Sequence, residues 1–417
     1  MLRALRNVRV AVVTLFQRYP WIGWVAWGIF VVAVLVRTHP RRFASTFAAY
    51  LDAAQRLWAG QQVYDPATLG DFLYLPLTLL IYVPFTLLDR VTAAALAMLL
   101  GAAFFTWACT MLTVALLLPR ERRMIDAIAL AGVPLLINIP AAWLNFKGVQ
   151  AQVPMTAAMM AACVAMIGSR WRMASFWLFV AIAMKPLAIV MVLLCGALVR
   201  EMRLPLIGAV AAAILVPFAF LEWSYLAAQY QAMALKLWHI ATAPPAQWIY
   251  QADFSTMARG LGVPLPAGVA LGIRIAAALG TLALAWRVKR DGGAKSFALA
   301  VLVLSGCYIT VFGPRNEFLS FIVLTPSLAV LAGLMLMRND ADGRGWLLVL
   351  AALLLGFTFD YLVVDGVLKP AIVLAIYLWL TWLMAVPARW RGIVEGDEAL
   401  RAGVSEPAMA GAVTGNR

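Results

Sequence analysis

Long apolar runs recur along this chain up to its C-terminal part, and they constrain its fold more than any other feature. Most hold roughly 17 to 25 residues, enough for a helix to cross a bilayer core of about 30 Å. Only 12% of the residues are charged, whereas a soluble domain carries roughly a quarter. A closed barrel would show short segments of alternating polarity instead. The sequence therefore predicts an all-α polytopic membrane protein.

The basic residues are scattered over short loops between the apolar runs, which indicates membrane orientation and argues against nucleic-acid binding despite a net charge of +14. Loops rich in Lys and Arg face the cytoplasm. The basic clusters are the N-terminal arginines, RERR at 120–123, RWR at 170–172, REMR at 200–203, RVKRDGGAK at 287–295, RNDADGR at 338–344 and RWR at 389–391. The first twenty residues show no pattern of a cleavable signal peptide, so we expect a basic cytoplasmic tail there.

Alternation from these clusters predicts about twelve crossings with both termini in the cytoplasm. The predicted crossings are 20–37, 91–118, 124–143, 151–168, 173–185, 186–199, 204–221, 267–286, 296–312, 318–337, 345–363 and 370–387. We expect one transmembrane domain, 1–394, followed by a disordered cytoplasmic tail, 395–417. Two large segments, 38–90 and 222–266, remain on the outer side. They favour an active site on the extracytoplasmic face.

One predicted pair of crossings is too short. Residues 173–199 must leave the cytoplasm and return with only about 14 residues in each arm, and at 1.5 Å per residue this gives roughly 21 Å. The apex of this hairpin is Lys185-Pro186. An ionisable group at membrane depth is a functional hypothesis by default. We interpret Lys185 as functional; the alternative is a structural lysine that snorkels to the interface.

Two arginines stand in or between predicted crossings. Arg274 lies about two turns into the run that begins near residue 267, where a phosphate or a buried carboxylate would be its partner. GPRNEF, 313–318, connects two crossings on the outer side and holds Arg315, Asn316 and Glu317. A simple turn needs only Gly and Pro. The alternative for this segment is an Arg–Glu pair that closes the loop.

Two further outer segments combine polar side chains with aromatic or amide groups. WIYQADFSTMARGLG, 248–262, is expected to be a re-entrant or surface helix that presents Asp253 and Ser255. Trp and Tyr suit the membrane interface as well as sugar stacking, so a purely anchoring helix is the alternative. NFKGVQAQ, 145–152, is expected to be an outer loop in which the amide of Gln150 could bind a sugar.

YLDAAQRLWAGQQVYDP, 50–66, is a half-charged stretch behind the first apolar run. Its spacing predicts an amphipathic helix on the outer membrane surface, with an apolar face of Tyr50, Ala53, Ala54, Leu57 and Trp58. Gly60 ends this helix as a C′ residue. Asp52 then offers a carboxylate above the membrane, and Tyr64 opens the turn that follows. The alternative is an interfacial helix without chemistry.

The sequence lacks the motifs of several enzyme classes. There is no Walker motif, G-x-S-x-G or H-E-x-x-H, so we expect neither a nucleotide cofactor nor a metal centre. The four cysteines, Cys109, Cys163, Cys195 and Cys307, all lie in apolar runs and are expected to pack in the core without disulfides or metal.

The chain resembles bacterial glycosyltransferase family 87, which comprises polyprenol-phosphate-mannose-dependent transferases of the GT-C fold. Each motif is weak alone, but all occur in the family's order. They are YLDAAQRLWAGQQVYDP, FLYLPLTLLIYVPFTLL, GVQAQ, MKPLAIVMVLL, QADFSTMARGLG and GPRNEFLSFIVLTP. The resemblance implies a GT-C-like bundle with surface-lying helices in its outer loops.

One position departs from the family pattern. An aspartate usually opens the first loop of the family and acts as general base, whereas this chain has Thr46 there. Threonine cannot serve as a carboxylate base. Asp52 is the candidate for that role, with Asp253 or Glu317 as alternates. Asp52 and the family position are about 120° apart around a helix, because each residue turns by roughly 100°.

These observations predict an inverting glycosyltransferase of the bacterial inner membrane. It would transfer a sugar, mannose by the resemblance, from a polyprenyl-phosphate donor to an envelope glycan or glycolipid. Lys185, Arg274 and Arg315 would contact the phosphate, and Tyr64, Gln150, Asp253, Ser255, Asn316 and Glu317 would line the substrate site. The alternatives are a transporter or lipid flippase, and an inactive relative that serves as an assembly subunit.

Overall fold

The structure of the chain is a computed structural model that describes residues 18–19, 21–37, 45–65, 72–117, 124–242, 251–313, 316–337, 343–357 and 364–396. Within these residues the chain is almost wholly helical, and the backbone pairing of Gln251 with Glu317 is an isolated antiparallel bridge. The predicted all-α class is therefore confirmed. Most of the predicted C-terminal tail, 397–417, lies outside the described residues.

The described helices follow the predicted apolar runs closely. In order they are α2 (Ile22–Arg37), α3 (Ser45–Trp58), α4 (Pro76–Tyr82), η2 (Val83–Leu87), α5 (Arg90–Leu117), α6 (Met124–Leu130), α7 (Gly132–Lys147), α8 (Gln152–Ile167), α9 (Trp171–Met184), η3 (Pro186–Ala188), α10 (Ile189–Leu198), α11 (Arg200–Leu215), η4 (Val216–Ala219), α12 (Trp223–Thr242), α13 (Phe254–Gly260), α14 (Ala267–Asp291), α15 (Ala294–Cys307), η6 (Tyr308–Phe312), η7 (Phe318–Val323), α16 (Thr325–Met337), α17 (Arg344–Gly356), η8 (Val364–Leu368), α18 (Lys369–Met384) and α19 (Pro387–Glu395).

Seven of these stretches are long and apolar enough to cross a membrane. They are Arg90–Leu117, Met124–Lys147, Arg200–Ala219, Ala267–Asp291, Ala294–Phe312, Phe318–Met337 and Gly366–Met384. The other predicted crossings coincide with shorter apolar helices, namely Ile22–Arg37, Gln152–Ile167, Trp171–Met184, Pro186–Leu198 and Arg344–Gly356. A multi-pass membrane protein is thus confirmed, and the number of crossings stays a prediction.

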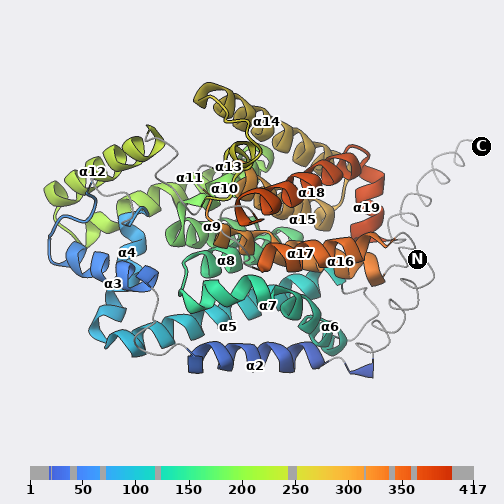
Figure 1. Cartoon of the computed structure of the whole chain (residues 1–417), viewed down its shortest axis with the longest axis horizontal. Coiled ribbons are helices and arrows are strands. Elements are labelled where there is room, and N and C mark those ends of the chain that lie inside the picture. The colour runs from blue at the N-terminus through green and yellow to red at the C-terminus, as the bar shows by residue number, and fades with distance from the viewer. Residues whose placement is uncertain are drawn as a thin grey trace, which may run out of the picture.

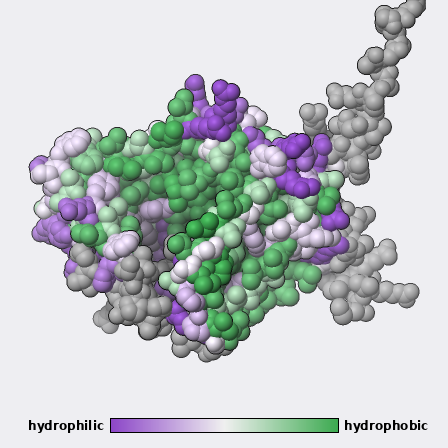
Figure 2. Space-filling model, turned by 90° about the horizontal axis from the view of Figure 1, so that it is seen from above, coloured by the Kyte–Doolittle hydropathy of each residue, from purple (hydrophilic) through white to green (hydrophobic). Residues whose placement is uncertain are grey.

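Burial separates the central helices from the peripheral ones. The stretches Ala294–Phe312 and Phe318–Met337 are 89% and 83% buried, and they form the centre of the bundle. The stretch Ala267–Asp291 is only 11% buried, although it is equally apolar. Helices that are apolar all round occur in cores or in membranes, so the exposed apolar side chains of α14 suit contact with lipid. Figure 2 shows a broad hydrophobic surface across the middle of the face that it displays.

Three helices of the predicted outer segments lie together at one end of the molecule, whereas α13 lies nearer its middle (Figure 1). Figure 1 shows α3, α4 and α12 together at this end, while α6 and α19 lie toward the opposite end. Basic residues of the predicted cytoplasmic side, Arg389 and Arg391, belong to α19. The later part of the predicted outer segment 38–90 contains two short helical pieces, α4 and η2. The 3₁₀ helix η2 begins at Val83 with Pro84 as its second residue, because proline cannot continue the α-helical hydrogen-bond ladder.

The first outer segment is fastened to α12 by side chains that were not predicted to interact. Tyr225 on α12 donates to the carbonyl of Gln61 at 2.7 Å, and the Gln229 side-chain oxygen accepts from the amide of Val63 at 3.1 Å. Gly60 has a φ of +70°, as expected of a residue that ends α3. Of the predicted apolar face, Tyr50, Ala53, Ala54 and Leu57 are buried in the protein, whereas Trp58 is 56% exposed.

A glycine contact lets α2 approach the bundle closely. A Cβ on Gly23 would collide with the backbone oxygen of Gly132 at the start of α7. A Cβ on Gly132 would in turn lie 2.9 Å from the amide nitrogen of Trp24. Small residues at such crossings allow transmembrane backbones to touch. The four cysteines are free and buried, which confirms the predicted core packing without disulfides.

Candidate functional site

Lys185 stands at the break between two short helices. Pro186 has no backbone N–H and disfavours the helical region for the residue before it. Lys185 accordingly adopts φ −153° and ψ 126°, after α9 ends at Met184 and before η3 begins. Its side chain does not reach solvent, because the residue is only 5% exposed. A buried ammonium group requires polar or charged partners, and these come from other helices.

Gln152, at the first residue of α8, supplies the main partner. The orientation of its amide that satisfies all neighbours turns the oxygen toward Lys185, and Nζ then donates to it at 2.6 Å. The same oxygen accepts from Ser320 Oγ at 2.9 Å, and the amide nitrogen donates to Asn145 Oδ1 at 2.9 Å. The ammonium also lies 5.2 Å from the ring centroid of Tyr74, within cation–π range. We call Lys185, Gln152, Asn145, Ser320 and Tyr74 the lysine cluster.

Neutral polar groups of α3 extend this cluster. The hydroxyl of Tyr50 donates to that of Tyr74 at 3.3 Å and lies 3.5 Å from the side-chain oxygen of Gln150. The amide nitrogen of Gln150 donates to Thr46 Oγ1 at 3.1 Å. Thr46 and Tyr50 are four residues apart and share one face of α3. The position where the family pattern has an aspartate therefore faces Gln150, one of the predicted substrate-binding residues.

Both phenols in this row stay protonated. Burial, the neighbouring Tyr74 and the charge of Glu317 raise the pKa of Tyr50 well above its usual value. Burial and the charge of Glu317 likewise raise the pKa of Tyr74. A protonated phenol can both donate and accept a hydrogen bond. This row of side chains can therefore bind hydroxyl groups of a sugar.

Glu317 directly precedes η7, the element that reaches the lysine cluster. Its side chain is exposed, and its backbone carbonyl accepts from the amide of Ser320 at 2.9 Å. The residues after it form η7, which brings Ser320 to Gln152 and the Leu319 carbonyl to Asn145 at 3.0 Å. The predicted loop residue Glu317 is thus joined to the predicted apex residue Lys185 through Ser320 and Gln152.

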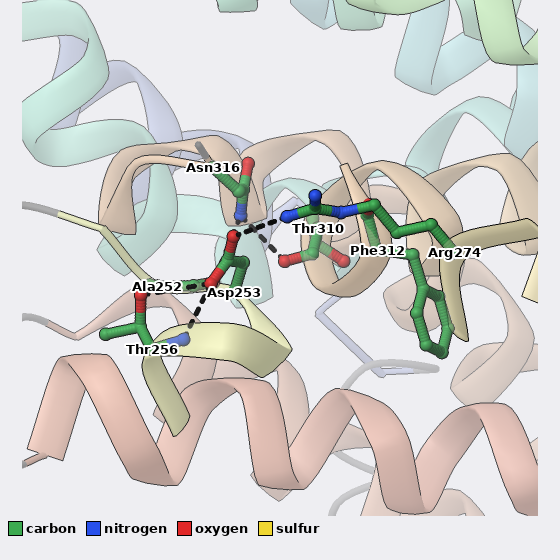
Figure 3. A network of polar contacts seen from close by, with 7 residues as sticks. All are labelled: Ala252, Asp253, Thr256, Arg274, Thr310, Phe312 and Asn316. Atoms are coloured by element: carbon green, nitrogen blue, oxygen red, sulfur yellow. Dashed lines mark hydrogen bonds and ion pairs between the residues drawn. The ribbon is translucent and has the colours of Figure 1, made fainter. Parts of the chain in front are cut away.

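Asp253 and Arg274 form a second polar group, shown in Figure 3. Asp253 caps α13 by accepting from the Thr256 amide at 2.8 Å, and it receives Arg274 at 3.4 Å in an ion pair. Asn316 is also here, with its amide nitrogen donating to the Thr310 carbonyl at 2.8 Å. Arg274 was predicted to contact a phosphate or a buried carboxylate, and in this structure its partner is a carboxylate.

Asp52, the predicted base, points elsewhere. It forms a 2.7 Å ion pair with Arg90, and both side chains are largely exposed at 45% and 67%. Asp52 and Tyr50 are two residues apart, which places them on nearly opposite sides of α3. The structure therefore does not bring Asp52 together with the side chains around Tyr50.

The remaining predicted site residues are Tyr64, Ser255 and Arg315. Tyr64 is fully buried. Its hydroxyl donates to the Tyr74 carbonyl at 2.7 Å and so helps to position the backbone of Tyr74. The Ser255 hydroxyl is buried without a hydrogen-bond partner in the structure. Arg315 lies outside the described residues.

Sequence reasoning missed much of the lysine cluster. The stretch 145–152 was expected to be an outer loop, yet Asn145 lies in α7 and Gln152 begins α8, and both are buried. The loop prediction was wrong because the turn between the helices occupies only 148–151. Buried amides next to apolar runs could have signalled these positions. Among the described residues, no group of three His, Cys, Asp or Glu side chains is placed to hold a metal ion.

Comparison with known families supplies one match. The model described as glycosyltransferase family 87 matches residues 72–314, which is more than half of the chain. The matched range contains Lys185, Gln152, Asp253 and Arg274, whereas Thr46 and Glu317 lie outside it. Comparisons with curated proteins and with solved structures gave no match.

Proposed function

The chain belongs to glycosyltransferase family 87, and from this premise we propose which sugar transfer it performs. The donor is a polyprenyl-phosphate-linked sugar, mannose by the family resemblance, and the acceptor is an envelope glycan or glycolipid. Transfer takes place at the extracytoplasmic face of the bacterial plasma membrane and inverts the anomeric centre. The coarser statement, a glycosyltransferase embedded in a membrane, follows from the family and from the apolar spans.

One observation carries the proposal. Lys185 is buried at a helix break, and Gln152 joins it to Ser320 of η7, the element that directly follows Glu317. A lipid-linked phosphate at the membrane surface needs a cation held out of bulk water, because charge interactions are strongest there. The acceptor hydroxyl needs a carboxylate close to that phosphate. In this proposal Lys185 supplies the cation and Glu317 supplies the carboxylate.

The geometry favours Glu317 as the general base over the two other carboxylates. Glu317 is exposed and can meet an acceptor. Asp253 already accepts hydrogen bonds from Thr256 and Arg274 with its two oxygens. Asp52 pairs with Arg90 on the far side of α3. Glu317 also directly precedes η7, whose Ser320 belongs to the lysine cluster.

The proposed step is a single displacement. The acceptor hydroxyl oxygen attacks the anomeric carbon, and its proton passes to the Glu317 carboxylate. The bond between the anomeric carbon and the phosphate oxygen breaks, and its electron pair stays on that oxygen. Lys185 stabilises the phosphate as its charge grows from one to two. Attack from the face opposite the leaving group inverts the configuration.

In this proposal, other predicted residues bind the sugar or the phosphate. Gln150, Tyr50 and Thr46 offer hydrogen bonds to sugar hydroxyls along α3. The buried Ser255 hydroxyl is available to a bound sugar. Arg315 is proposed as a second phosphate contact, since it follows Gly313-Pro314 on the same segment as Glu317.

The test is transfer of radiolabelled mannose from synthetic polyprenyl-phosphate-mannose to membrane extract by the purified full chain in lipid nanodiscs. We expect Lys185→Ala to abolish transfer and Glu317→Gln to lower kcat by about 10²- to 10⁴-fold, the usual value of a general base. Asp52→Asn is expected to lower kcat much less. Glu222→Gln, at an exposed carboxylate on the outer end, is the matched control.

Each outcome tests a different part of the proposal. Loss with Asp52→Asn but not with Glu317→Gln would return the base to Asp52. Absence of transfer from a panel of polyprenyl-phosphate sugars, with folded protein, would reject the donor class and favour an inactive assembly subunit. Uptake of the labelled lipid into vesicles without transfer would favour a flippase.

A further inference from the structure

A closed ring of polar contacts joins two outer segments that lie far apart in the sequence. The first segment is 251–253, directly before α13, and the second is 310–317, which contains the end of η6 and Glu317. Arg274 on α14 stands between them (Figure 3). Three kinds of contact close this ring: an ion pair, hydrogen bonds from Arg274 and Asn316 to backbone carbonyls, and direct backbone pairing.

Asp253 fixes the first segment. Its Oδ1 accepts from both the amide and the hydroxyl of Thr256, at 2.8 and 3.0 Å, so it caps α13. Its Oδ2 faces Arg274 Nη2 at 3.4 Å. The side chain of Asp253 is only 3% exposed. A carboxylate buried to this degree needs a compensating positive charge, and Arg274 supplies it.

Arg274 holds the second segment at the same time. Its Nε donates to the carbonyl of Phe312 at 3.2 Å, and its guanidinium lies 5.3 Å from the ring centroid of Phe254. Phe312 is the last residue of η6, a π-helical turn. Helix ends leave carbonyl groups without intrahelical partners, so this carbonyl depends on a side-chain donor. The planar guanidinium can face a carboxylate and a carbonyl together, whereas an ammonium cannot reproduce this fork.

Backbone contacts then couple the position of the first segment to that of Glu317. The amide of Ala252 donates to the Asn316 carbonyl at 2.7 Å, and Gln251 and Glu317 are antiparallel bridge partners. The Asn316 side chain donates to the carbonyls of Thr310 and Ala252, at 2.8 and 3.4 Å. Moving residues 251–253 would therefore move Glu317.

From this ring we infer that the Asp253–Arg274 ion pair is a positioning device for Glu317. The inference rests on the proposed function, in which Glu317 is the general base. It assigns Arg274 a different task from the phosphate contact expected from the sequence. Arg274 acts through residues 251–253 and the Phe312 carbonyl, whereas Lys185 acts on the phosphate itself.

The two tasks predict different kinetics for the same substitution. Loss of a phosphate contact weakens donor binding and leaving-group stabilisation, and its effect adds to that of a missing base. Loss of a positioning residue lowers kcat while the donor KM changes little. Because a positioning residue acts through one group, its effect disappears once that group is removed.

The experiment is a double-mutant cycle of Arg274→Met and Glu317→Gln in the nanodisc transfer assay. We expect Arg274→Met to lower kcat at least tenfold with the donor KM within about twofold. In the Glu317→Gln background, Arg274→Met is expected to lower kcat by less than twofold. Arg274→Lys keeps the charge without the planar guanidinium, and its kcat should lie between those of the wild type and Arg274→Met. Asp253→Asn should lower kcat less than Asp253→Ala, because Asn can still cap α13.

A second measurement does not depend on activity. The pair Gln251→Cys and Glu317→Cys should form a disulfide on oxidation, since opposed residues of an antiparallel pair have Cβ atoms about 4.5–5.5 Å apart. The native cysteines are buried, so they give little background. We expect addition of Arg274→Met, or of Arg274→Lys if the former does not fold, to slow this disulfide several-fold.

The possible results decide the inference. Equal loss of kcat from Arg274→Met with and without Glu317, a donor KM raised tenfold, or an unchanged rate of disulfide formation would each overturn it. If Glu317→Gln leaves kcat unchanged while Arg274→Met still slows the disulfide, the proposed base is wrong but the ring is real. The two failures are therefore distinguishable.

Discussion

The side-chain amide of Gln150 donates to the hydroxyl of Thr46 across 3.1 Å, and this bond ties the turn after α7 to the first outer helix α3. The two residues are more than a hundred positions apart in the sequence. Gln150 also meets the Tyr50 hydroxyl, so one amide orders both polar residues on this face of α3. A change at Thr46 therefore acts on the same polar face of α3 as Gln150 and Tyr50.

Removing this amide should impair transfer more than removing the hydroxyl. Thr46→Val deletes one neutral hydrogen bond, worth roughly 0.5–1.5 kcal/mol, and we expect kcat/KM to fall by about two- to tenfold. Gln150→Leu leaves both Thr46 and Tyr50 without this partner, and a larger loss is expected. Steady-state kinetics for the acceptor checks the order, which a greater effect from Thr46→Val would contradict.

Substitutions of Gln152 should separate orientation of Lys185 from its charge. Gln152→Leu removes the oxygen that lies 2.6 Å from Lys185 Nζ, and a buried charge without its partner is costly. We expect lower thermal stability together with lower kcat. Gln152→Glu puts a carboxylate against the ammonium and competes with the donor phosphate, so we expect a raised donor KM with stability retained. Gln55→Leu, on the exposed side of α3, is the control for both measurements.

The close approach of α2 to α7 should not tolerate a methyl group. Gly23→Ala places a Cβ against the backbone of Gly132, and overpacking of this kind costs about 1–3 kcal/mol. We expect a lower midpoint of thermal unfolding in detergent. Gly28→Ala on the same helix has open space around its new Cβ and should leave the midpoint unchanged. Equal effects of the two substitutions would argue against this packing.

The C-terminal helix α19 should stabilise the start of α15. Glu395 accepts from the backbone amides of Gly293 and Ser296, at 3.0 and 3.4 Å, and so caps a helix that lacks a side-chain cap of its own. Glu395→Ala is expected to cost about 1 kcal/mol, the typical value of a cap. Glu395→Gln keeps an acceptor oxygen and should cost less. Thermal unfolding of both variants measures the difference.

The predicted orientation can be tested by labelling with a membrane-impermeant maleimide in intact cells. Gln61→Cys is exposed at the end that holds α3 and α12, and Arg170→Cys is exposed in a predicted cytoplasmic loop. We expect Gln61→Cys to react in intact cells, and Arg170→Cys to react only after permeabilisation. The reverse pattern would place the lysine cluster on the cytoplasmic side and contradict the proposed donor geometry.

The sequence by itself determined the elements of this protein. Apolar runs of membrane length predicted the helices, and the Lys185-Pro186 pair predicted a broken hairpin because proline forbids the continuous ladder. The spacing of residues 50–60 predicted α3 and its end at Gly60. Each of these properties is local, since helical periodicity and proline geometry depend on neighbours within a few positions.

Only the tertiary structure decided which polar side chains meet. Asp52 and Tyr50 lie on one short helix, yet the first pairs with Arg90 and the second with Tyr74. Arg274 was open to a phosphate or a carboxylate until packing placed Asp253 beside it. A buried charge takes the partner that packing brings within reach, and that partner can lie a hundred residues away. No pattern within a single helix encodes that choice.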